Sequence, residues 1–488
     1  MKHILKVVCM TSIAMLCLTA CQNTLQSSSV TSKNDGSFDA NIAIEASESH
    51  APDSTSTIKY EEIFYSTDNS VEFQIDIDKN ISTPDMPIVQ VRPHYFTEQE
   101  VQRIAESLFG QADFFDARPS RSTEFTKSEI LKKIVRWAKY VDNASICELY
   151  GRNAEHIADL VSRYIEKYTL MAESAPEGTR DDRSQWKYKK ATYYIWPESE
   201  ISKGDTVEDN DEIQVDVKTE HIPYRITAAV RDKSDYKLSM ISAYPYDGAS
   251  PGGIDGDIFR AWLCRTNEPT QTQTNFIKEK AERMLNEMGL GSWLVDQCYV
   301  ETKYYGDIPE YIVHVNATPL LCTAPVSRHA QLTNLKSPQA YASSLYLSDV
   351  NFQFSADGNL VKFEMYTPLD IVEVINPNVE VMSFDTLFER AKDSLRLSDA
   401  NSYGIDNLEN LTEEVICTVK ITDFDYGLTR VKVPDTDDSY YYVPSFTLKG
   451  NVELTGVDTG NLYLISSVPI TLLTLNAVDG SILHTSNW

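Results

Sequence analysis

Two acidic clusters in the sequence, at residues 76–80 and 435–438, have the alternating spacing that opens a calcium-binding loop. Such a loop also needs Gly at its sixth position, for a sharp turn, and a bidentate Glu at its twelfth. Those positions hold Ile81 and Pro87 after the first cluster, and Tyr440 and Phe446 after the second. We therefore predict no calcium site at either cluster. Residues 435–442 are interpreted as a solvated hairpin loop, and an acidic aromatic loop that contacts a ligand is the open alternative.

The sequence lacks the structural context of common hydrolase and nucleotide-binding motifs. GASPG at residues 248–252 matches GxSxG in letters, but it runs into the Gly-rich stretch 250–256, which does not open the capped helix that a nucleophile elbow needs. There is no HExxH and no Walker loop. The histidines of the main body have no second ligand at metal-binding spacing. They are His94, His156, His221, His314, His329 and His484. The sequence therefore predicts no metal site and no cofactor.

Paired carboxylates and tryptophans are the remaining residues that could support glycoside hydrolysis or sugar binding. A glycosidase uses two carboxyl groups, but nothing in the sequence selects two of its 72 acidic residues. Tryptophans can also form a platform for sugars. The set is Trp137, Trp186, Trp196, Trp262 and Trp293. Because Trp137 lies on the apolar stripe of an expected helix, core packing is favoured for the set. The sequence thus favours a non-enzymatic protein and names no catalytic residue.

Cys21 is the one position with a specific chemical prediction. Lys2 and Lys6 precede an apolar run over residues 7–18, which is too short to span a bilayer. The run ends in LTAC at residues 18–21, and small residues before a Cys at this place resemble the lipobox of bacterial lipoproteins. That resemblance implies cleavage after residue 20 and a diacylglycerol on the Cys21 sulfur. An ordinary secretory signal, with Cys21 present by chance, is the alternative.

The segment after Cys21 has the composition of a tether. Residues 22–57 contain nine Ser and four Thr and few large apolar residues, too few to offset the entropy of ordering. Two acyl chains suffice for stable anchoring at ~0.8 kcal/mol per buried CH₂. No later run approaches 18 apolar residues. We therefore expect an extracytoplasmic body, anchored to the outer face of the cytoplasmic membrane by the lipid on Cys21.

The charge of the chain excludes two classes of partner. With 44 Lys and Arg against 72 Asp and Glu, the 488-residue chain carries a formal charge of −28. Loss of the signal removes Lys2 and Lys6 and no acidic residue, which leaves 42 − 72 = −30. Nucleic acids bind clustered basic residues, and an anionic membrane surface attracts them. We therefore expect no nucleic-acid partner and no electrostatic docking on the membrane.

Five further cysteines fit neither a disulfide scaffold nor a zinc site. They are Cys147, Cys264, Cys298, Cys322 and Cys417. They are odd in number, widely separated and without a CxxC motif. Most are expected to be small buried hydrophobic residues, and one disulfide between distant cysteines stays open.

The N-terminal half contains strands, capped helices and a hairpin. Residues 71–78 alternate apolar and polar, and 88–93 form a second short strand. Thr97 and Glu100 form a capping box flanked by Phe96 and Val101, which predicts a helix that ends at Gly110. The expected elements after it are a helix from Thr126, a helix over 153–171, and a hairpin of strands 222–230 and 236–241. The acidic run 208–212 is interpreted as a solvated turn.

The C-terminal half contains a weak internal repeat. A helix from about Thr274 precedes strands at 311–315, 350–354 and 360–366, with an Asp-Gly turn at 357–358. A second helix after Ser383 precedes strands at 415–421, 441–448 and 470–475, with an Asp-Gly turn at 479–480. The helix starts are 383 − 274 = 109 residues apart and the turns 479 − 357 = 122. This pattern predicts two related helix-plus-sheet units.

We therefore predict an α+β fold of antiparallel sheets with packed helices. The predicted segments are a signal peptide (1–20), the lipidated Cys and tether (21–59), an N-terminal α+β module with three helices (60–175), a β-rich region (176–270), a first helix-plus-sheet unit (271–376) and a second (377–488).

Several motifs resemble an uncharacterised group of Gram-positive lipoproteins, catalogued as domain of unknown function 6034. The resemblance rests on residues 86–89, 96–101 and 108–110. It implies a lipobox, a tether, a central β region and C-terminal helix-plus-sheet units over most of the mature chain. Residues 441–446 and 473–481 are also similar to PepSY-type domains, which are associated with extracytoplasmic regulation of peptidases and signalling. The group has no assigned catalytic residues.

The sequence thus leads to one main functional hypothesis and two alternatives. The main hypothesis is a lipid-anchored, non-enzymatic binding or regulatory module for an envelope protein, a peptide or a cell-wall ligand. The first alternative is a cell-envelope hydrolase with two carboxyl groups about 5–9.5 Å apart. The second is a solute-capture lipoprotein, for which two α/β lobes with parallel sheets are expected.

Overall fold

The structure is a computed structural model of the chain. It describes residues 56–81, 86–110, 112–116, 126–128, 130–131, 134–135, 138, 154–175, 177, 189–195, 205–219, 223–233, 236–245, 263–264, 267–305, 308–327, 349–398, 415–432, 439–456, 462–464 and 469–485. The predicted signal, Cys21 and most of the predicted tether lie outside these residues.

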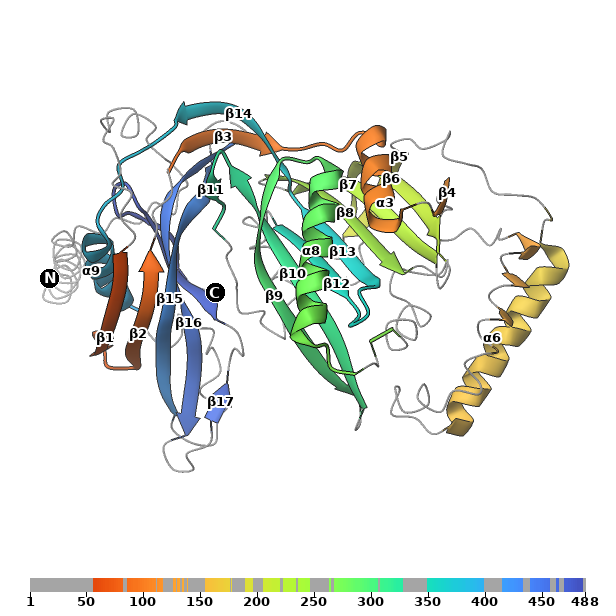
Figure 1. Cartoon of the computed structure of the whole chain (residues 1–488), viewed down its shortest axis with the longest axis horizontal. Helices are drawn as coiled ribbons and strands as arrows, with labels where there is room; N and C mark the ends of the chain where they lie inside the picture. The colour runs from red at the N-terminus through yellow and green to blue at the C-terminus, as the bar shows by residue number, and fades with distance from the viewer. Residues whose placement is uncertain are drawn as a thin grey trace, which may run out of the picture.

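Two large, mainly antiparallel sheets form the body (Figure 1). Sheet A contains β1 (Ser56–Tyr65), β2 (Val71–Ile81), β3 (Ile88–Pro93), β14 (Leu369–Asn376), β15 (Val415–Lys432), β16 (Tyr440–Gly456), β17 (Leu462–Leu464), β18 (Ile470–Asn476) and β19 (Ile482–Thr485). Sheet B contains β4 (Asp113–Asp116), β5 (Lys189–Ile195), β6 (Asp205–Lys218), β7 (Pro223–Lys233), β8 (Tyr236–Pro245), β9 (Ser292–Tyr305), β10 (Ile308–Leu321), β11 (Ala324–Pro325), β12 (Asp349–Phe354) and β13 (Leu360–Tyr366). The predicted α+β class is confirmed.

Among the helices named in the described residues, three cover the sheets and one lies apart. They are α3 (Glu98–Phe109), α8 (Gln271–Met288) and α9 (Phe384–Leu395), with α6 (Ala154–Ser174) at the far end of the molecule (Figure 1). Helices α3 and α8 pack on one face of sheet B and share its core, and α9 packs on sheet A. Each sheet thus has one apolar, helix-covered face and one face turned away from its helices.

Local capping explains where these helices begin. Thr97 Oγ1 accepts a hydrogen bond from the Glu100 backbone N–H, and the Glu100 carboxylate accepts one from the Thr97 backbone N–H, as the sequence predicts. The next helix, α8, begins after Thr270, whose capping box is closed by Gln273. The predicted start near Thr274 is therefore one turn late, because the Thr-x-x-Gln box at 270–273 was not identified. Ser383 caps α9 as predicted.

The internal repeat is confirmed at the level of strand order. The order α8-β9-β10-β12-β13 matches α9-β15-β16-β18-β19, and in each unit consecutive strands of the set pair antiparallel. A short strand, β11 or β17, follows the second strand of each unit and pairs with it. In both units the expected Asp-Gly turn joins the last two strands, and Gly358 and Gly480 have positive φ there. The turns are held by Lys280 Nζ to the Gly358 oxygen at 2.8 Å and Arg390 to the Asp479 oxygen at 2.7 Å.

The sheets do not follow the segments predicted from the sequence. β1 to β3 join the C-terminal strands of sheet A, while β4 and α3 join sheet B. β2 pairs parallel with β15, Val71 beside Cys417. The expected module 60–175 is thus divided between both sheets. Sequence periodicity identifies strands but not their distant partners.

Three local expectations are corrected by the structure. Residues 56–59, assigned to the tether, begin β1, where Ser56 pairs with Ile81. The acidic run 208–212 is part of β6 and not a turn; its Asp211 and Glu212 lie opposite Lys190 and Lys189. The hairpin strands continue to Lys233 and Tyr236, so their connection is shorter than the predicted five residues.

The chain crosses between the sheets at two adjacent places along the top of the molecule (Figure 1). β3 leads into α3, and β13 leads into β14, which pairs with β3. His94 joins the crossings: its backbone N–H donates to the Pro368 oxygen, and its Nδ1 lies 2.8 Å from Asp370 Oδ1. The Thr367 N–H donates to Ser239 of β8 at 2.7 Å. The second crossing is thereby fixed to both sheets.

Candidate functional site

The outward face of sheet B carries a continuous band of polar side chains. Its inward residues, such as Val315, Phe352 and Phe363, are fully buried under the helices, so alternate residues of the same strands point the other way. We call the outward set the polar face. It comprises Gln297, Tyr299, Glu301 and Lys303 (β9), His314 and Asn316 (β10), Asn351 and Gln353 (β12), Lys362, Glu364 and Tyr366 (β13) and Tyr244 (β8).

Four amides of the polar face form a directed chain of hydrogen bonds, which we call the amide ladder. Gln353 donates to Asn351 Oδ1 at 3.3 Å, Asn351 donates to Asn316 Oδ1 at 2.5 Å, and Asn316 donates to Gln297 Oε1 at 2.9 Å. The β10–β12 pairing places Asn316 directly opposite Asn351. Because each amide has two N–H donors and an oxygen with two lone pairs, every member keeps groups that the ladder does not use.

His314 lies beside the ladder and pairs with a carboxylate. Its Nε2 donates to Glu301 Oε2 at 2.9 Å, and its ring stacks against Tyr299, centroids 4.9 Å apart. Burial lowers the pKa of His314, and the hydrogen bond to Glu301 opposes this only in part. Burial alone would raise the pKa of Glu301, but the contacts with His314 and Lys303 lower it overall. The pair is therefore a neutral imidazole with an ionised carboxylate at neutral pH.

The other end of the face is centred on Glu364. This carboxylate accepts from the hydroxyls of Tyr244 and Tyr366, the latter at 2.8 Å, and pairs with Lys362 Nζ at 2.7 Å. Lys362 also lies over the Tyr244 ring, 5.0 Å from its centroid. The negative charge of Glu364 is thereby balanced by the Lys362 ammonium group.

The polar face is open at one end and closed at the other. Tyr299 on β9 is 44% exposed, whereas His314 and Asn316 on β10 are 8% and 7% exposed. Further along, the bidentate Arg225–Asp216 ion pair of β7 and β6 is fully buried, with Nε to Oδ1 at 2.8 Å. A ligand therefore has access to the outward residues of β9, and the buried groups of β10 position them.

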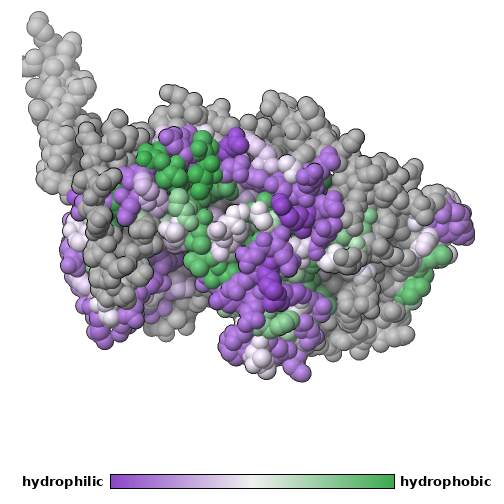
Figure 2. Space-filling model, turned by 45° about the horizontal axis from the view of Figure 1, so that its top comes forward, coloured by the Kyte–Doolittle hydropathy of each residue, from purple (hydrophilic) through white to green (hydrophobic). Residues whose placement is uncertain are grey.

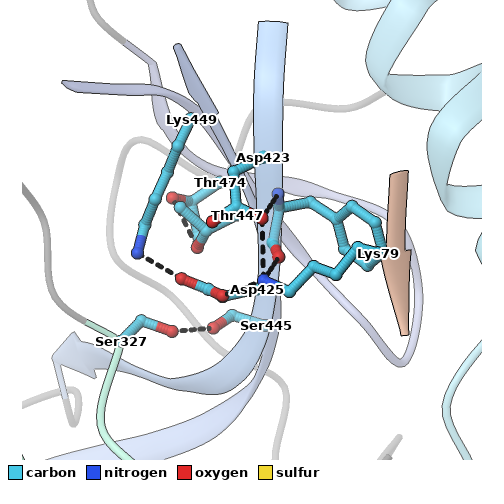
Figure 3. A network of polar contacts seen from close by, with 9 residues as sticks. Lys79, Ser327, Asp423, Asp425, Ser445, Thr447, Lys449 and Thr474 are labelled. Atoms are coloured by element: carbon cyan, nitrogen blue, oxygen red, sulfur yellow. Dashed lines mark hydrogen bonds and ion pairs between the residues drawn. The ribbon is translucent and has the colours of Figure 1, made fainter. Parts of the chain in front are cut away.

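Sheet A has a different polar arrangement around β15 (Figure 3). Lys79 Nζ lies 2.7 Å from Asp423 Oδ1 and 2.8 Å from Asp425 Oδ1, and Lys449 binds the other oxygen of Asp425. Burial alone would raise the pKa of Asp425, but the two ammonium groups lower it overall. We call these four residues the ion-pair cluster.

Short hydroxyl side chains fill the sheet beside the ion-pair cluster (Figure 3). Thr447 and Thr474 lie 3.2 Å apart, Ser445 and Ser327 lie 3.1 Å apart, and Thr429 donates to Ser445 at 2.8 Å. All five are buried. Their hydrogen bonds close on one another and on the backbone oxygen of Gly427. This face is internally satisfied, which is typical of a structural network.

The two Asp side chains of the ion-pair cluster come close to the geometry that a hydrolase needs. Because both contact Lys79 Nζ, their oxygens are at most 2.7 + 2.8 = 5.5 Å apart, near the ~5–5.5 Å of a retaining glycosidase. The acid of such a pair needs a raised pKa, whereas Asp425 has a lowered one. The cluster therefore has the chemistry of an ion-pair network and not of a general acid with a nucleophile.

The cysteines and tryptophans singled out from the sequence lie partly inside and partly outside the described residues. Cys21 and Cys147 lie outside the described residues, as does the loop 433–438. The four described cysteines form no disulfide with one another; Cys264 and Cys417 are buried as expected, Cys298 is half-buried and Cys322 is exposed. Trp293 packs against the core of sheet B, with its indole N–H on the Leu290 oxygen at 2.9 Å. Trp137, Trp186, Trp196 and Trp262 lie outside the described residues.

The carboxylate partners of two histidines could not be identified from the sequence. His94 and His314, isolated in sequence, each contact a carboxylate brought to them by strand pairing. The amide ladder was not predicted either. The signal was present in the polar, alternate positions of the predicted strands 311–315 and 350–354, but the partner strand β9 had not been identified.

Among the described residues, no three His, Cys, Asp or Glu side chains gather closely enough to hold a metal ion. No helix in that part of the chain is both long and apolar enough to cross a membrane.

An apolar patch lies on β14, where the top of the molecule is turned forward in Figure 2. Ile371, Val372 and Val374 are exposed there. The pairing of β14 with β3 is interrupted by two register shifts, and Asp370 and Glu373 interrupt the apolar run. Bulges and charges of this kind protect edge strands from pairing with other chains.

Comparison with known proteins gives little further information. No family model matches the chain, and no curated protein matches it. Among solved structures, the chain is similar to an uncharacterized protein from Eubacterium rectale, at 11% sequence identity and a TM-score of 0.39, over 91% of this chain and 97% of that one. A likeness at this level carries no argument about function.

Proposed function

We propose that this chain is a lipid-anchored, extracytoplasmic binding protein without enzymatic activity, whose ligand docks on the polar face of sheet B. The observation that carries the proposal is the amide ladder. Its exposed end, Gln297, accepts one hydrogen bond from Asn316 and keeps both amide N–H groups for a ligand. Among the described residues, it makes no other side-chain hydrogen bond.

The state of the carboxylates supports binding over hydrolysis. Asp425 is paired with two lysines, Glu301 with His314 and Lys303, and Glu364 with Lys362 and two tyrosines. The pKa values of Asp425 and Glu301 are lowered, and a general acid needs the opposite shift. The solute-capture alternative predicts parallel sheets, whereas the only parallel ladder between named, described strands joins β2 and β15.

Photo-crosslinking in intact cells tests the binding proposal. A photoreactive residue placed at Gln297 of the full chain is expected to capture a ligand. The same residue at Gln102, on α3 and thus on the helix-covered side, serves as the matched control. Equal capture at both positions would contradict the proposal. So would a cell-wall hydrolase activity of the purified protein that is lost in Asp425→Asn.

The anchor is tested by substitution of Cys21. In the Cys21→Ala chain, the sulfur that would receive the diacylglycerol is absent, so we expect the protein to move from the membrane fraction to the soluble fraction. Cys17→Ala, in the same N-terminal segment, is the control and should leave the protein on the membrane. If the Cys21→Ala chain stays membrane-bound to the same extent, the lipobox interpretation is wrong.

A further inference from the structure

The unused groups of the amide ladder are suited to one kind of ligand. A hydroxyl group both donates and accepts a hydrogen bond, and an amide offers an adjacent donor and acceptor. Gln297 keeps two donors, while Gln353, which donates once to Asn351, keeps a donor and its carbonyl oxygen. Carboxylate ligands would use only the donors, and ammonium ligands only the acceptors. A ligand rich in hydroxyl groups uses both.

Charges around the ladder cancel. Lys303 pairs with Glu301 at 3.3 Å, and Lys362 pairs with Glu364 at 2.7 Å. Since burial lowers the pKa of His314, the imidazole adds no positive charge at neutral pH. The chain as a whole carries −28, which repels anions. An uncharged ligand meets no electrostatic penalty here.

The exposed ring of Tyr299 adds an apolar contact beside these polar groups. Tyr299 lies on β9, which pairs with β10 alone among the described strands, so the ring stands at the accessible edge of the face. It is held upright against His314, the two rings parallel to within 1°. A fixed aromatic ring next to amides can pack the apolar C–H face of a sugar while the amides bind its hydroxyls.

An extended peptide fits this surface less well. Peptides that add to sheets pair with a free strand edge through their backbone, whereas the ladder lies on the face of the sheet and offers side chains only. From β9 to β12, the strands that carry the ladder, the strand order spans two intervals of ~4.8 Å, about 10 Å in all. That length accommodates a short oligosaccharide.

We propose that the polar face binds an uncharged oligosaccharide laid across β9, β10 and β12, with Gln297 and Gln353 binding hydroxyl groups and Tyr299 packing on a sugar ring. This inference rests on the proposed function, because it names the ligand class of the same face. Asn316 and His314 are positioning residues, which fix the exposed amides and the tyrosine ring.

Calorimetric titration of the full-length protein in detergent tests the inference. The probes are cellohexaose and chitohexaose as neutral hexasaccharides, hexagalacturonate as a charged one, and a neutral hexapeptide. We expect at least one neutral hexasaccharide to bind, with an affinity that changes less than about twofold between low and high salt, because no net charge is paired. Gln297→Ala and Gln353→Ala should each weaken binding about tenfold, and Gln102→Ala should leave it unchanged.

A second variant and the charged and peptide probes distinguish an oligosaccharide from other classes of ligand. Tyr299→Leu preserves bulk but removes the aromatic face, and it should also weaken binding; folding of each variant is checked by circular dichroism. If only hexagalacturonate or the peptide binds and Gln297→Ala weakens it, the oligosaccharide inference is overturned while the proposed function stands. If no probe binds at ~10 mM, the inference is overturned, and crosslinking at Gln297 decides the proposed function separately.

Discussion

Sheet A and sheet B contain the same helix-plus-four-strand unit, but their outward faces are filled differently. On sheet A, short hydroxyls such as Ser445 and Thr447 pair with one another and are buried. On sheet B the corresponding positions carry longer amides and an exposed tyrosine, and Gln297 and Gln353 keep unused hydrogen-bonding groups. A repeated architecture thus leaves one face satisfied from within and one face available to a ligand.

The separate cores provide the strongest test of this comparison. Phe446 is fully buried under α9, with the Phe424 and Tyr426 ring centroids each at 5.4 Å. Phe352 is fully buried under α8 and lies 4.9 Å from Phe363. Phe446→Ala and Phe352→Ala should each cost about 3–5 kcal/mol. Hydrogen exchange should show loss of protection in β16 for the first variant and in β10 for the second.

This outcome depends on the division into two cores. Equal loss of protection in both strands for either variant would show that the sheets unfold as one unit, and the comparison between them would then not describe separate bodies. An exposed, conservative change such as Ile416→Val on β15 is a suitable control, because Ile416 is half exposed.

Substitution of the equivalent turn glycines, Gly480 and Gly358, should have a smaller effect on the free energy of unfolding. Both glycines have positive φ, +70° and +76°, which costs an L-residue about 1–2 kcal/mol. A Cβ at Gly480 would also lie 2.5 Å from the Arg390 guanidinium, whereas at Gly358 the nearest atom is 3.5 Å away on Phe276. Urea unfolding should therefore show a larger loss of stability for Gly480→Ala than for Gly358→Ala.

A double variant isolates the cause of that difference. Adding Arg390→Ala to each single variant removes the clash at Gly480 and leaves the Gly358 turn untouched. The extra cost of Gly480→Ala should then disappear. If it persists, the contact with Arg390 is not what distinguishes the two turns.

The third test uses pH and has the smallest effect. The pKa of His314 is lowered in the folded chain, so the unfolded chain binds a proton first and stability falls as the pH drops below ~6.5. One proton limits the slope to about 1.4 kcal/mol per pH unit. The charged groups that face the ring are Glu301, Lys303 and Lys362. The protection factors of the β10 amides, which correct for the intrinsic pH dependence of exchange, should fall between pH 7 and pH 5.

Sheet A should respond at other pH values through its ion-pair cluster. Asp425 has a lowered pKa, so its contribution is lost only as the pH falls below its ordinary value of 3.8. Lys79 has a raised pKa, and its contribution is lost above its ordinary value of 10.5. His314→Gln should abolish the dependence of β10 between pH 7 and pH 5. Unchanged dependence in that variant would show that another group is responsible.

Much of the local structure could be predicted from short-range signals. The capping box at Thr97 and the Asp-Gly turns at 357–358 and 479–480 act within a few residues, so the sequence alone identifies them. The acidic run 208–212 is typical of a solvated turn in sequence, but its backbone belongs to β6, which pairs with β5 and β7. The strand depends on partners that lie elsewhere in the sequence.

The candidate site was harder to predict because it depends on strand partners and on a bulge. The register shift between β9 and β10 inserts Asp296 as an extra residue in β9, since Gln297 pairs with Asn316 and Val295 with Ala317. This extra residue breaks the period-two alternation of β9, and the strand was not predicted. Without β9, the sequence does not show which residues lie beside His314 and Asn316. Gln297, the last amide of the ladder, is then also missing from the prediction.

The parallel pairing of β2 with β15 has a consequence for the order of events during synthesis. The end of β2 and the start of β15 are 415 − 81 = 334 residues apart, which is roughly 17–67 s of translation at ~5–20 residues per second. During this interval β1 and β2 form only a two-stranded hairpin, which is marginal in water. All strands of sheet B emerge within the same interval. The first strands to be made are therefore among the last to find their final neighbours, and a nascent chain exposes Phe73 and Ile75 until its final quarter is complete.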